Sequence, residues 1–480
     1  MNDQETMRRK RRAMRMRKKR RQRNLLIGAM IAGFLLIVVI IVSGISAINR
    51  KRAEEEYARE QAELQEQQEL FKEKIVKAKT LLNKLYAQMF QTEDAAFAEW
   101  FFENCSGSEK EAFLEFSEKQ ELTNADIYEL TGESMYVLSD RYQGLLADEE
   151  TAASNNIYIK ESKEEENVSI SVAGDLCLTE DGFVIDHYDE VGSLEECISP
   201  EILQITNETD LFYVNHEYTI SDRGAPLAGK YYTFRAKPER MSILKEMGTD
   251  IVSLANNHVY DYGAEALYDT ADLLEEAGIP YVGGGRNIAE AKRPIYMIVN
   301  GIKIGFVGAS NGERIKYTPQ ATEDTPGILR AYDTTEYNEV IQKASKECDY
   351  LIAYIHWGTE DSNYLNEDQQ RWGREFLNSG ADIVIGGHPH VLQGIEYVDG
   401  KPIIYSLGDF WFNHETKYTG LLKLNINLDG LQKMSFVPCL QTGFTTQYLS
   451  EPEEQQELYE FLEELSPNIT IDSEGIIRES

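Results

Sequence analysis

Acidic, amide and imidazole side chains follow five short apolar runs between residues 168 and 390. They are Asp175, Glu217, Asn257 with His258, His356, and His388 with His390. A loop at the carboxyl end of a buried strand is where α/β proteins commonly place reactive groups. One such residue alone is usually a turn former or a packing residue. Five of these endings in one domain instead predict a common metal site.

The mixture of ligand types suits one or two divalent cations. Imidazole binds zinc, manganese, iron or nickel, and carboxylate or amide oxygen binds harder cations, so manganese, iron and zinc all fit. Two cations about 3.5–4 Å apart can share a bridging carboxylate, and we expect Glu217 to take that place. His258 does not have to be a ligand, because it could instead protonate a leaving oxygen.

Strands that alternate with helices are expected to position these side chains. The apolar runs are 168–172, 211–214, 251–254, 351–355 and 383–385, and helical patterns at 265–277 and 369–379 lie between some of them. This alternation predicts an α/β domain with a partly parallel sheet. Asn-Gly or Asp-Gly pairs at 300–301, 399–400 and 429–430 predict additional hairpins.

The N-terminal region predicts a membrane anchor. Residues 1–24 are strongly basic, residues 25–48 carry no charge and are long enough to span a bilayer, and Arg50, Lys51 and Arg52 follow. The apolar run is too long for a cleaved signal peptide. Because the basic tail outweighs the three later cations, we expect a cytoplasmic tail and an extracytoplasmic main domain in a single-pass protein of the cell membrane.

The rest of the chain divides by composition. Residues 53–91 are expected to form a helical stalk whose seven-residue apolar repeat is compatible with a coiled coil and a homo-oligomer. A small helical module (92–146), an acidic linker (147–167), the main domain (168–445) and a C-terminal helix with a tail (446–480) are predicted to follow. The net charge of −34 argues against nucleic acid as a partner. Five cysteines do not form a disulfide scaffold, although a single bridge is left open.

Six motifs of the main domain resemble the CapA family of capsule and poly-γ-glutamate biosynthesis proteins. They are VAGDLCLTEDG, VNHEYTISDRG, VSLANNHVYDYG, IAYIHWGTED, GADIVIGGHPHVLQG and YSLGDFWF. The family is similar in fold to calcineurin-like metallophosphoesterases. The resemblance therefore implies a four-layer α/β/β/α sandwich and a membrane-anchored protein that helps to make, export or anchor an anionic capsule polymer such as poly-γ-glutamate.

The resemblance also implies roles for single residues. Asp175, Glu217, Asn257, His356, His388 and His390 match metal ligands, and Asn257 and His258 match the catalytic Asn-His pair. The chain departs from the wider fold family at Cys177, where phosphoesterases usually have a histidine. It departs from the CapA pattern at Asp409, which is commonly asparagine.

Two functions from different classes remain open. A metal-dependent phosphoesterase-like hydrolase is favoured, and a non-catalytic subunit that binds polymer and stabilises a capsule synthase complex is the alternative. On the substrate side we expect Asn256, Asp409 and Arg235, with the cations near Arg235 lining a path for the anionic polymer. Ordinary surface charge explains those cations nearly as well.

Overall fold

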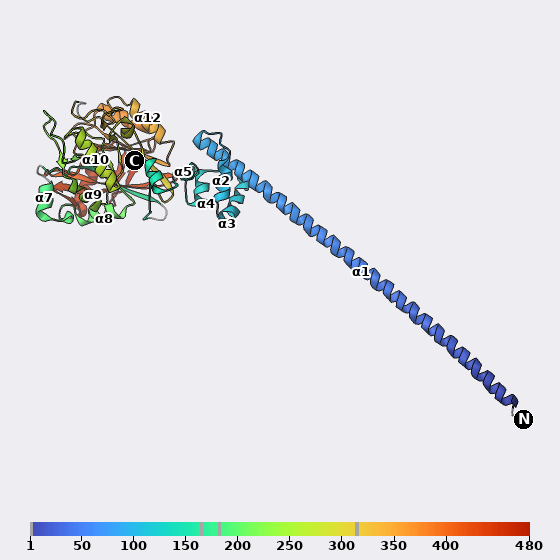
Figure 1. Ribbon diagram of the computed structural model, residues 1–480. Helices are drawn as coiled ribbons and strands as arrows, with labels where there is room; N and C mark the ends of the chain where they lie inside the picture. Colours follow the sequence, from blue (N-terminus) through green and yellow to red (C-terminus); the bar gives the residue numbers. More distant parts are fainter. Residues whose placement is uncertain (1–2, 164–166, 181–183, 313–315) are drawn as a thin grey trace. The chain divides into compact units, whose positions relative to one another are not determined.

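The computed structural model describes residues 3–163, 167–180, 184–312 and 316–480 (Figure 1). The chain forms two compact units, residues 1–78 and residues 79–480. Helix α1 (Asp3–Phe90) makes up the first unit and continues into the second. It holds one segment that is long and apolar enough to cross a membrane, and that segment is not buried by protein. The helix covers the predicted stalk as far as Phe90, while its self-association stays a prediction.

The end of α1 packs into a small helical module in the second unit. The module contains α2 (Phe97–Asn104), α3 (Gly107–Phe113), η1 (Leu114–Glu118), α4 (Asn124–Thr131) and α5 (Met135–Tyr142). Tyr86 of α1 stacks on Phe97 at 4.0 Å between ring centroids. The module is joined to the sandwich by a buried ion pair of 2.6 Å between Lys303 and Asp140.

The main domain contains two large sheets. The first has the order β1 (Ile157–Lys160), β9 (Ile295–Val299), β10 (Ile302–Ser310), β12 (Tyr350–His356), β13 (Ile383–Gly387), β15 (Lys401–Ile404), β14 (Ile395–Val398). The second has the order β19 (Thr445–Tyr448), β18 (Gly430–Thr442), β17 (Lys417–Asn427), β2 (Val168–Leu176), β3 (Leu211–His216), β6 (Ile251–Ser253), β7 (Tyr281–Val282), and β16 (Asp409–Trp411) also pairs with β2.

Short elements connect these strands. They are α7 (Val184–Val191), η2 (Leu194–Glu196), β4 (Thr219–Ile220), β5 (Arg235–Ala236), η3 (Pro238–Arg240), β8 (Gly284–Gly285), α11 (Ile288–Ala291) and β11 (Gly327–Ile328). The strands that lead to the site, β2, β3 and β6 in one sheet and β12 and β13 in the other, pair in parallel. The three predicted hairpin turns join the antiparallel pairs β9–β10, β14–β15 and β17–β18.

Three buried clusters define four layers. The inner cluster takes side chains from both sheets, among them Ile170 and Phe306. The outer clusters lie between a sheet and its helices: α8 (Pro200–Glu208), α9 (Met241–Glu246) and α10 (Ala264–Ala277) on one side, α12 (Thr335–Ala344) and α13 (Glu367–Asn378) on the other. Both faces of each sheet are covered, which explains the continuous apolar runs. The expected four-layer α/β/β/α sandwich is confirmed.

Two predicted boundaries are wrong. Residues 147–167 are not simply a linker, because they contain α6 (Glu149–Ser154) and β1, which pairs in parallel with β9; residues 164–166 lie outside the described part. β1 is only four residues long, and acidic residues around it mask its Ile157 and Ile159. The C-terminal tail also belongs to the domain. After α14 (Pro452–Leu465), β20 (Ile469–Ile471) and β21 (Ile477–Glu479) pair, and Leu458 and Ile477 join the inner core.

Candidate metal centre

The polar side chains at the strand ends meet because parallel register aligns them. Asp175 on β2 pairs with Asn215 on β3 and, on its other side, with Asp409 on β16. In the facing sheet, His356 at the end of β12 pairs with Gly387 at the end of β13. The carboxyl ends of both parallel sets therefore lie at the same edge of the sandwich.

Three overlapping groups of ligand atoms lie at this edge. They are Glu217 with His388 and His390, Asp175 with His390 and Asp409, and Asp175 with Glu217 and His356. Within each group the ligand atoms lie within 4.8 Å of one another. Asp175, Glu217 and His390 each belong to two groups, so the arrangement offers adjoining positions that share ligands. We call the six residues of the three groups the strand-end cluster: Asp175, Glu217, His356, His388, His390 and Asp409.

Orphaned polar atoms show that the cluster suits a cation. Glu217 Oε1 and His388 Nδ1 are buried without a hydrogen-bond partner in the described structure. The Nε2 atoms of three histidines lie around Glu217 Oε1: His356 at 3.6 Å, and His258 and His390 at 3.9 Å. An unpaired buried carboxylate oxygen costs several kcal/mol unless a cation or donor compensates it. The donor set of carboxylates and imidazoles fits a divalent transition metal.

Burial controls the protonation of the cluster. It raises the pKa of Glu217, and the adjacent Asp175 carboxylate raises it further. It also raises the pKa of Asp175 to about 6 and lowers the pKa of His388 to about 3. His388 is therefore a neutral imidazole, the form that binds metals. Burial would also lower the pKa of His390, but Asp409 and Glu217 outweigh it and raise that pKa to about 10.

The loop that carries His388 and His390 is held in an unusual backbone conformation. The φ angles are +97° at His388 and +58° at His390, a region that residues other than glycine rarely adopt. The backbone N–H of His388 donates to Asp175 Oδ2 at 3.0 Å. A Cβ on Gly387 would lie 2.3 Å from the hydroxyl of Tyr354. The close approach of this loop to β2 and β12 explains why glycine precedes the histidines.

Asn215 links Asp175 and Glu217 within the cluster, and it was not predicted from the sequence as a site residue. Its amide nitrogen lies 2.8 Å from Asp175 Oδ1 and 3.0 Å from Glu217 Oε2. The available signal was its position two residues before Glu217 in the NHE motif. Asn257 Oδ1 lies 2.7 Å from His356 Nε2, and its role as a metal ligand stays a prediction.

A second missed residue, Asp261, positions His258. Asp261 Oδ2 lies 2.7 Å from His258 Nδ1 and accepts the backbone N–H of Phe234 at 2.7 Å. Lys230 Nζ, also buried, pairs with Asp261 Oδ1 at 2.7 Å. This arrangement leaves His258 Nε2 on the side of Glu217. The signal was an acid three residues after the histidine in NNHVYDYG.

Burial lowers the pKa of His258 to about 4, although Asp261 opposes this shift. The ring is therefore neutral near pH 7. It can accept a proton from a group beside Glu217, and as an imidazolium it could then donate one.

The three residues expected on the substrate side lie in different places. Asn256 is fully buried, and its amide bonds to Asn215 Oδ1 and to the His216 carbonyl, so it supports the site from within. Asp409 belongs to the strand-end cluster, with Oδ1 2.8 Å from His390 Nδ1. Arg235 stacks on Tyr262 at 4.1 Å and donates to the Arg223 carbonyl. Each of these three side chains already has a protein partner, and its contact with a substrate stays a prediction.

The cations near Arg235 are mostly engaged with carboxylates. Arg240 pairs with Glu180 and Asp189, Lys237 also pairs with Glu180, and Arg223 pairs with Asp269. Burial would raise the pKa of Glu180, but hydrogen bonds from Arg240 and Lys237 outweigh it and lower that pKa to about 2. An anion would have to displace these partners, so the structure argues against the expected path.

Cys177 does not take the place of the missing histidine. It is fully buried in the outer hydrophobic cluster that also contains Val184 and Phe412. All five cysteines are unpaired, so the bridge that the sequence left open is not formed.

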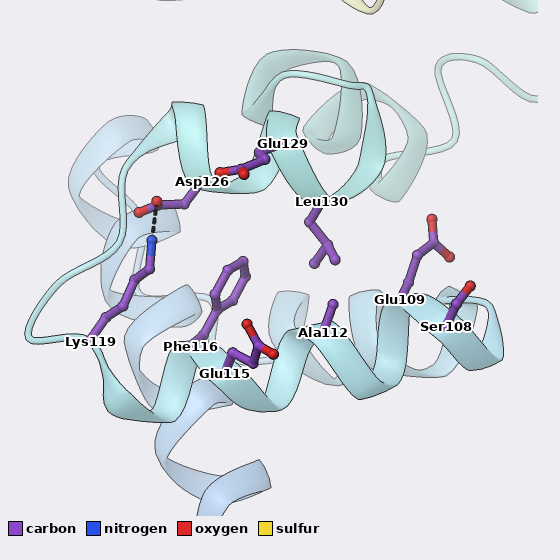
Figure 2. Close-up of a pocket in the computed structure, with 9 residues that line it drawn as sticks. All are labelled: Ser108, Glu109, Ala112, Glu115, Phe116, Lys119, Asp126, Glu129 and Leu130. Atoms are coloured by element: carbon purple, nitrogen blue, oxygen red, sulfur yellow. Dashed lines mark hydrogen bonds and ion pairs between the residues drawn. The ribbon is translucent and has the colours of Figure 1, made fainter.

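Two cavities differ in chemistry. A cleft of about 230 Å³ opens onto the strand-end cluster and is lined by His258 and His390 together with aromatic and acidic residues. A larger groove of about 400 Å³ lies between α3, η1 and α4 in the helical module (Figure 2). Its described lining holds four carboxylates and Lys119 but neither histidine nor cysteine. We call it the acidic groove. Of these two cavities, the smaller one has the lining suited to metal chemistry, as far as the described residues show.

Known proteins share the main domain. The family described as "Bacterial capsule synthesis protein PGA_cap" matches residues 169–414. The PGA biosynthesis protein CapA of Bacillus subtilis is 33% identical over 215 residues, which are 44% of this chain and 56% of that protein. The capsule biosynthesis protein CapA of Bacillus anthracis is 31% identical over 217 residues, 44% of this chain and 52% of that protein.

The matched region therefore spans about half the length of these curated relatives. A 5'-nucleotidase structure from Candida albicans aligns with 58% of this chain and 54% of its own, at 16% identity and a TM-score of 0.33. The family match covers just over half of the chain, from β2 to the loop after β16. The chain belongs to the PGA_cap family of bacterial capsule synthesis proteins.

Proposed function

We propose that this protein is a membrane-anchored, metal-dependent phosphoesterase-like hydrolase that acts outside the cytoplasm in the synthesis, export or anchoring of a capsule polymer such as poly-γ-glutamate. The observation that carries the proposal is Glu217 Oε1, a buried carboxylate oxygen among three imidazole nitrogens. The family match supports the biological role, and the apolar segment of α1 supports the anchor.

Asp175, Glu217, His356, His388 and His390 would hold the metal, with Asp409 against His390. A divalent cation at such a site polarises a phosphoryl oxygen and stabilises the charge that develops on it. The chain's own residues supply the rest. Asp261 orients the His258 ring through Nδ1, so that Nε2 can accept a proton from the attacking water and, as part of an imidazolium, give it to a leaving oxygen.

Metal content and turnover of the full chain test this proposal. We would purify the protein in detergent, measure its metals by elemental analysis, and follow p-nitrophenyl phosphate hydrolysis with added manganese, iron or zinc. We expect at least one equivalent of metal and a turnover that His258→Ala reduces by about 10²–10⁴-fold without loss of metal. A protein that binds no metal contradicts the proposal.

The second function is a non-catalytic subunit that binds polymer and stabilises a synthase complex. Cys177, which supplies no ligand from the buried outer core, favours it. Bound metal without turnover, together with co-purification of synthase subunits, would support this alternative.

Protease added to intact cells tests the topology, since only an extracytoplasmic main domain is expected to be cleaved.

A further inference from the structure

We propose that the cleft beside the strand-end cluster is a subsite for a sugar ring, so that the ligand of this protein contains a glycan part. This inference rests on the proposed function for the place of the cleft but names a substrate class of its own. It is carried by two independent features of the lining: a set of fixed aromatic rings, and a charge balance that disfavours a polyanion.

A chain of ring contacts leads from solvent to the cluster. Tyr232 is 58% exposed and its ring lies 6.4 Å from that of Phe234, with an interplanar angle of 27°. Phe234 contacts the ring of His258 at 4.3 Å and that of Phe412 at 5.6 Å. Phe412 contacts His390 at 4.8 Å. Aromatic rings therefore line the cleft from its exposed end to the end beside the strand-end cluster.

Hydrogen bonds from their own backbone N–H groups fix the positions of Phe234 and Phe412. The N–H of Phe234 donates to Asp261, and the N–H of Phe412 donates to Gln441 Oε1 at 2.7 Å. The side chains of Phe234 and Phe412 are only 8% and 7% exposed, so they are walls that need no rearrangement. A preformed aromatic pocket with a few polar groups is the usual form of a small-molecule site, and it limits the entropy lost on binding.

The charges around the rings oppose a run of carboxylates. Glu360, Asp361 and Glu415 line the cleft, and Lys417 is its only lysine or arginine among the described residues. Lys417 already pairs with Glu415 at 2.7 Å and with Asp361 at 3.1 Å. A polyglutamate segment would meet three carboxylates, one lysine already paired with two of them, and the imidazole of His390, so carboxylates still outnumber cations in the lining. Salt screens charges only beyond a Debye length of about 8 Å, so it would not remove the repulsion between a bound carboxylate and the carboxylates of the lining.

A sugar ring fits both features. Its axial C–H groups can lie on the face of Tyr232, as apolar surfaces do on aromatic rings. Its hydroxyls can donate to Glu360 and Asp361, and hydrogen bonds to charged acceptors are the stronger ones. A neutral ring also brings no charge that these carboxylates would repel.

Binding of uncharged oligosaccharides to the full chain in detergent tests the inference. We would measure N-acetylglucosamine tetramer, cellotetraose and poly-γ-glutamate by calorimetry, each with and without a chelator. We expect at least one neutral oligosaccharide to bind, and Tyr232→Ala to weaken that binding about tenfold, as truncation of a stacked anchor does. Tyr364→Ala is the matched control, because that ring is 81% exposed but does not line the cleft.

The chelator separates this inference from the proposed function. Sugar binding that survives metal removal, in a protein with or without turnover, supports the subsite. If neither oligosaccharide binds, or if Tyr232→Ala and Tyr364→Ala have equal effects, the inference is overturned even when metal and turnover are present. Binding of poly-γ-glutamate alone, weakened by Tyr232→Ala, overturns it as well, because the cleft would then take the anion directly.

Discussion

The strand-end cluster and the acidic groove are both rich in carboxylates, yet their carboxylates have different partners. In the acidic groove, Asp126 accepts a hydrogen bond from Lys119 (Figure 2) and another from the Thr123 backbone N–H, and Glu109 accepts the backbone N–H of Ser106 at the start of α3. In the cluster, Glu217 is completely buried and one of its oxygens has no donor in the described structure. Carboxylates at helix ends find backbone N–H groups, whereas a carboxylate enclosed by two sheets is costly to ionise unless a cation or enough donors compensate it.

The size of a cavity and the number of its carboxylates therefore do not identify the functional site. The groove is the larger cavity, and its carboxylates are either paired or open to water. In the cluster, folding leaves a carboxylate oxygen, Glu217 Oε1, and an imidazole nitrogen, His388 Nδ1, without a hydrogen-bond partner among the described residues, and such a cost is retained where it serves binding or catalysis.

The largest expected difference concerns metal. Glu217→Gln removes the carboxylate that two of the three ligand groups share, so we expect metal affinity to fall more than about a hundredfold. Glu115→Gln in the acidic groove makes the same chemical change and should leave the metal content unchanged. Elemental analysis after dialysis measures both. Equal losses in the two variants would end the distinction between the regions.

The same pair separates the two regions by stability. In metal-free protein, Glu217→Gln is expected to raise the unfolding free energy by about 1–2 kcal/mol, because it removes a buried carboxyl group whose charged form burial disfavours. Glu115→Gln is expected to change it by less than about 0.5 kcal/mol. Denaturant titration of the chelated proteins measures this difference, and a destabilised Glu217→Gln variant would contradict it.

The next largest effect concerns turnover. Asp261→Asn keeps the shape of the side chain but no longer stabilises a protonated His258, so we expect phosphoester turnover to fall about hundredfold with metal content unchanged. Its pH profile should shift, which a merely structural change would not produce. Asp269→Asn, at the surface pair with Arg223, is the control and should keep full turnover.

A smaller effect is expected at the paired cations. The pKa of Glu180 is lowered, so its pairing stabilises the folded state above the ordinary glutamate pKa, and this stability is lost as the pH falls from about 4.5 towards about 2. Because Glu180 is partly exposed, we expect Glu180→Gln to cost only about 1 kcal/mol at pH 7. The variant and the parent should converge at pH 2–3 in thermal unfolding. A difference that persists at that pH would show that packing, not charge, is responsible.

The smallest effect is expected for the acidic groove itself. Glu115→Gln combined with Glu129→Gln removes two exposed carboxylates and should change the unfolding free energy by about 0.5 kcal/mol or less. Calorimetric unfolding measures this change. A loss of several kcal/mol would mean that these carboxylates have partners that the comparison does not recognise.

Periodicity and motif spacing predicted much of the fold and most of the residues that meet in the strand-end cluster. Apolar runs that end in Asp175, Glu217, His356 and His388 are local patterns, and a strand buried on both faces has to be apolar throughout. The strand β1 was not predicted because four residues among acidic ones give too weak a pattern. Asn215 and Asp261 were not predicted as site residues because hydrogen bonding to a neighbour has no sequence period.

The amino-acid sequence by itself determined which residue types stand at the strand ends, the apolar segment of the N-terminal helix, and the family to which the motifs belong. Only the tertiary structure decided that Asp409 meets His390, that Arg235 lies on Tyr262, and that the cleft is walled by Tyr232, Phe234 and Phe412. The physical reason is that local patterns follow from short-range sterics and burial. Which charges pair, and which remain without partners, depends on how two sheets and their loops meet in space.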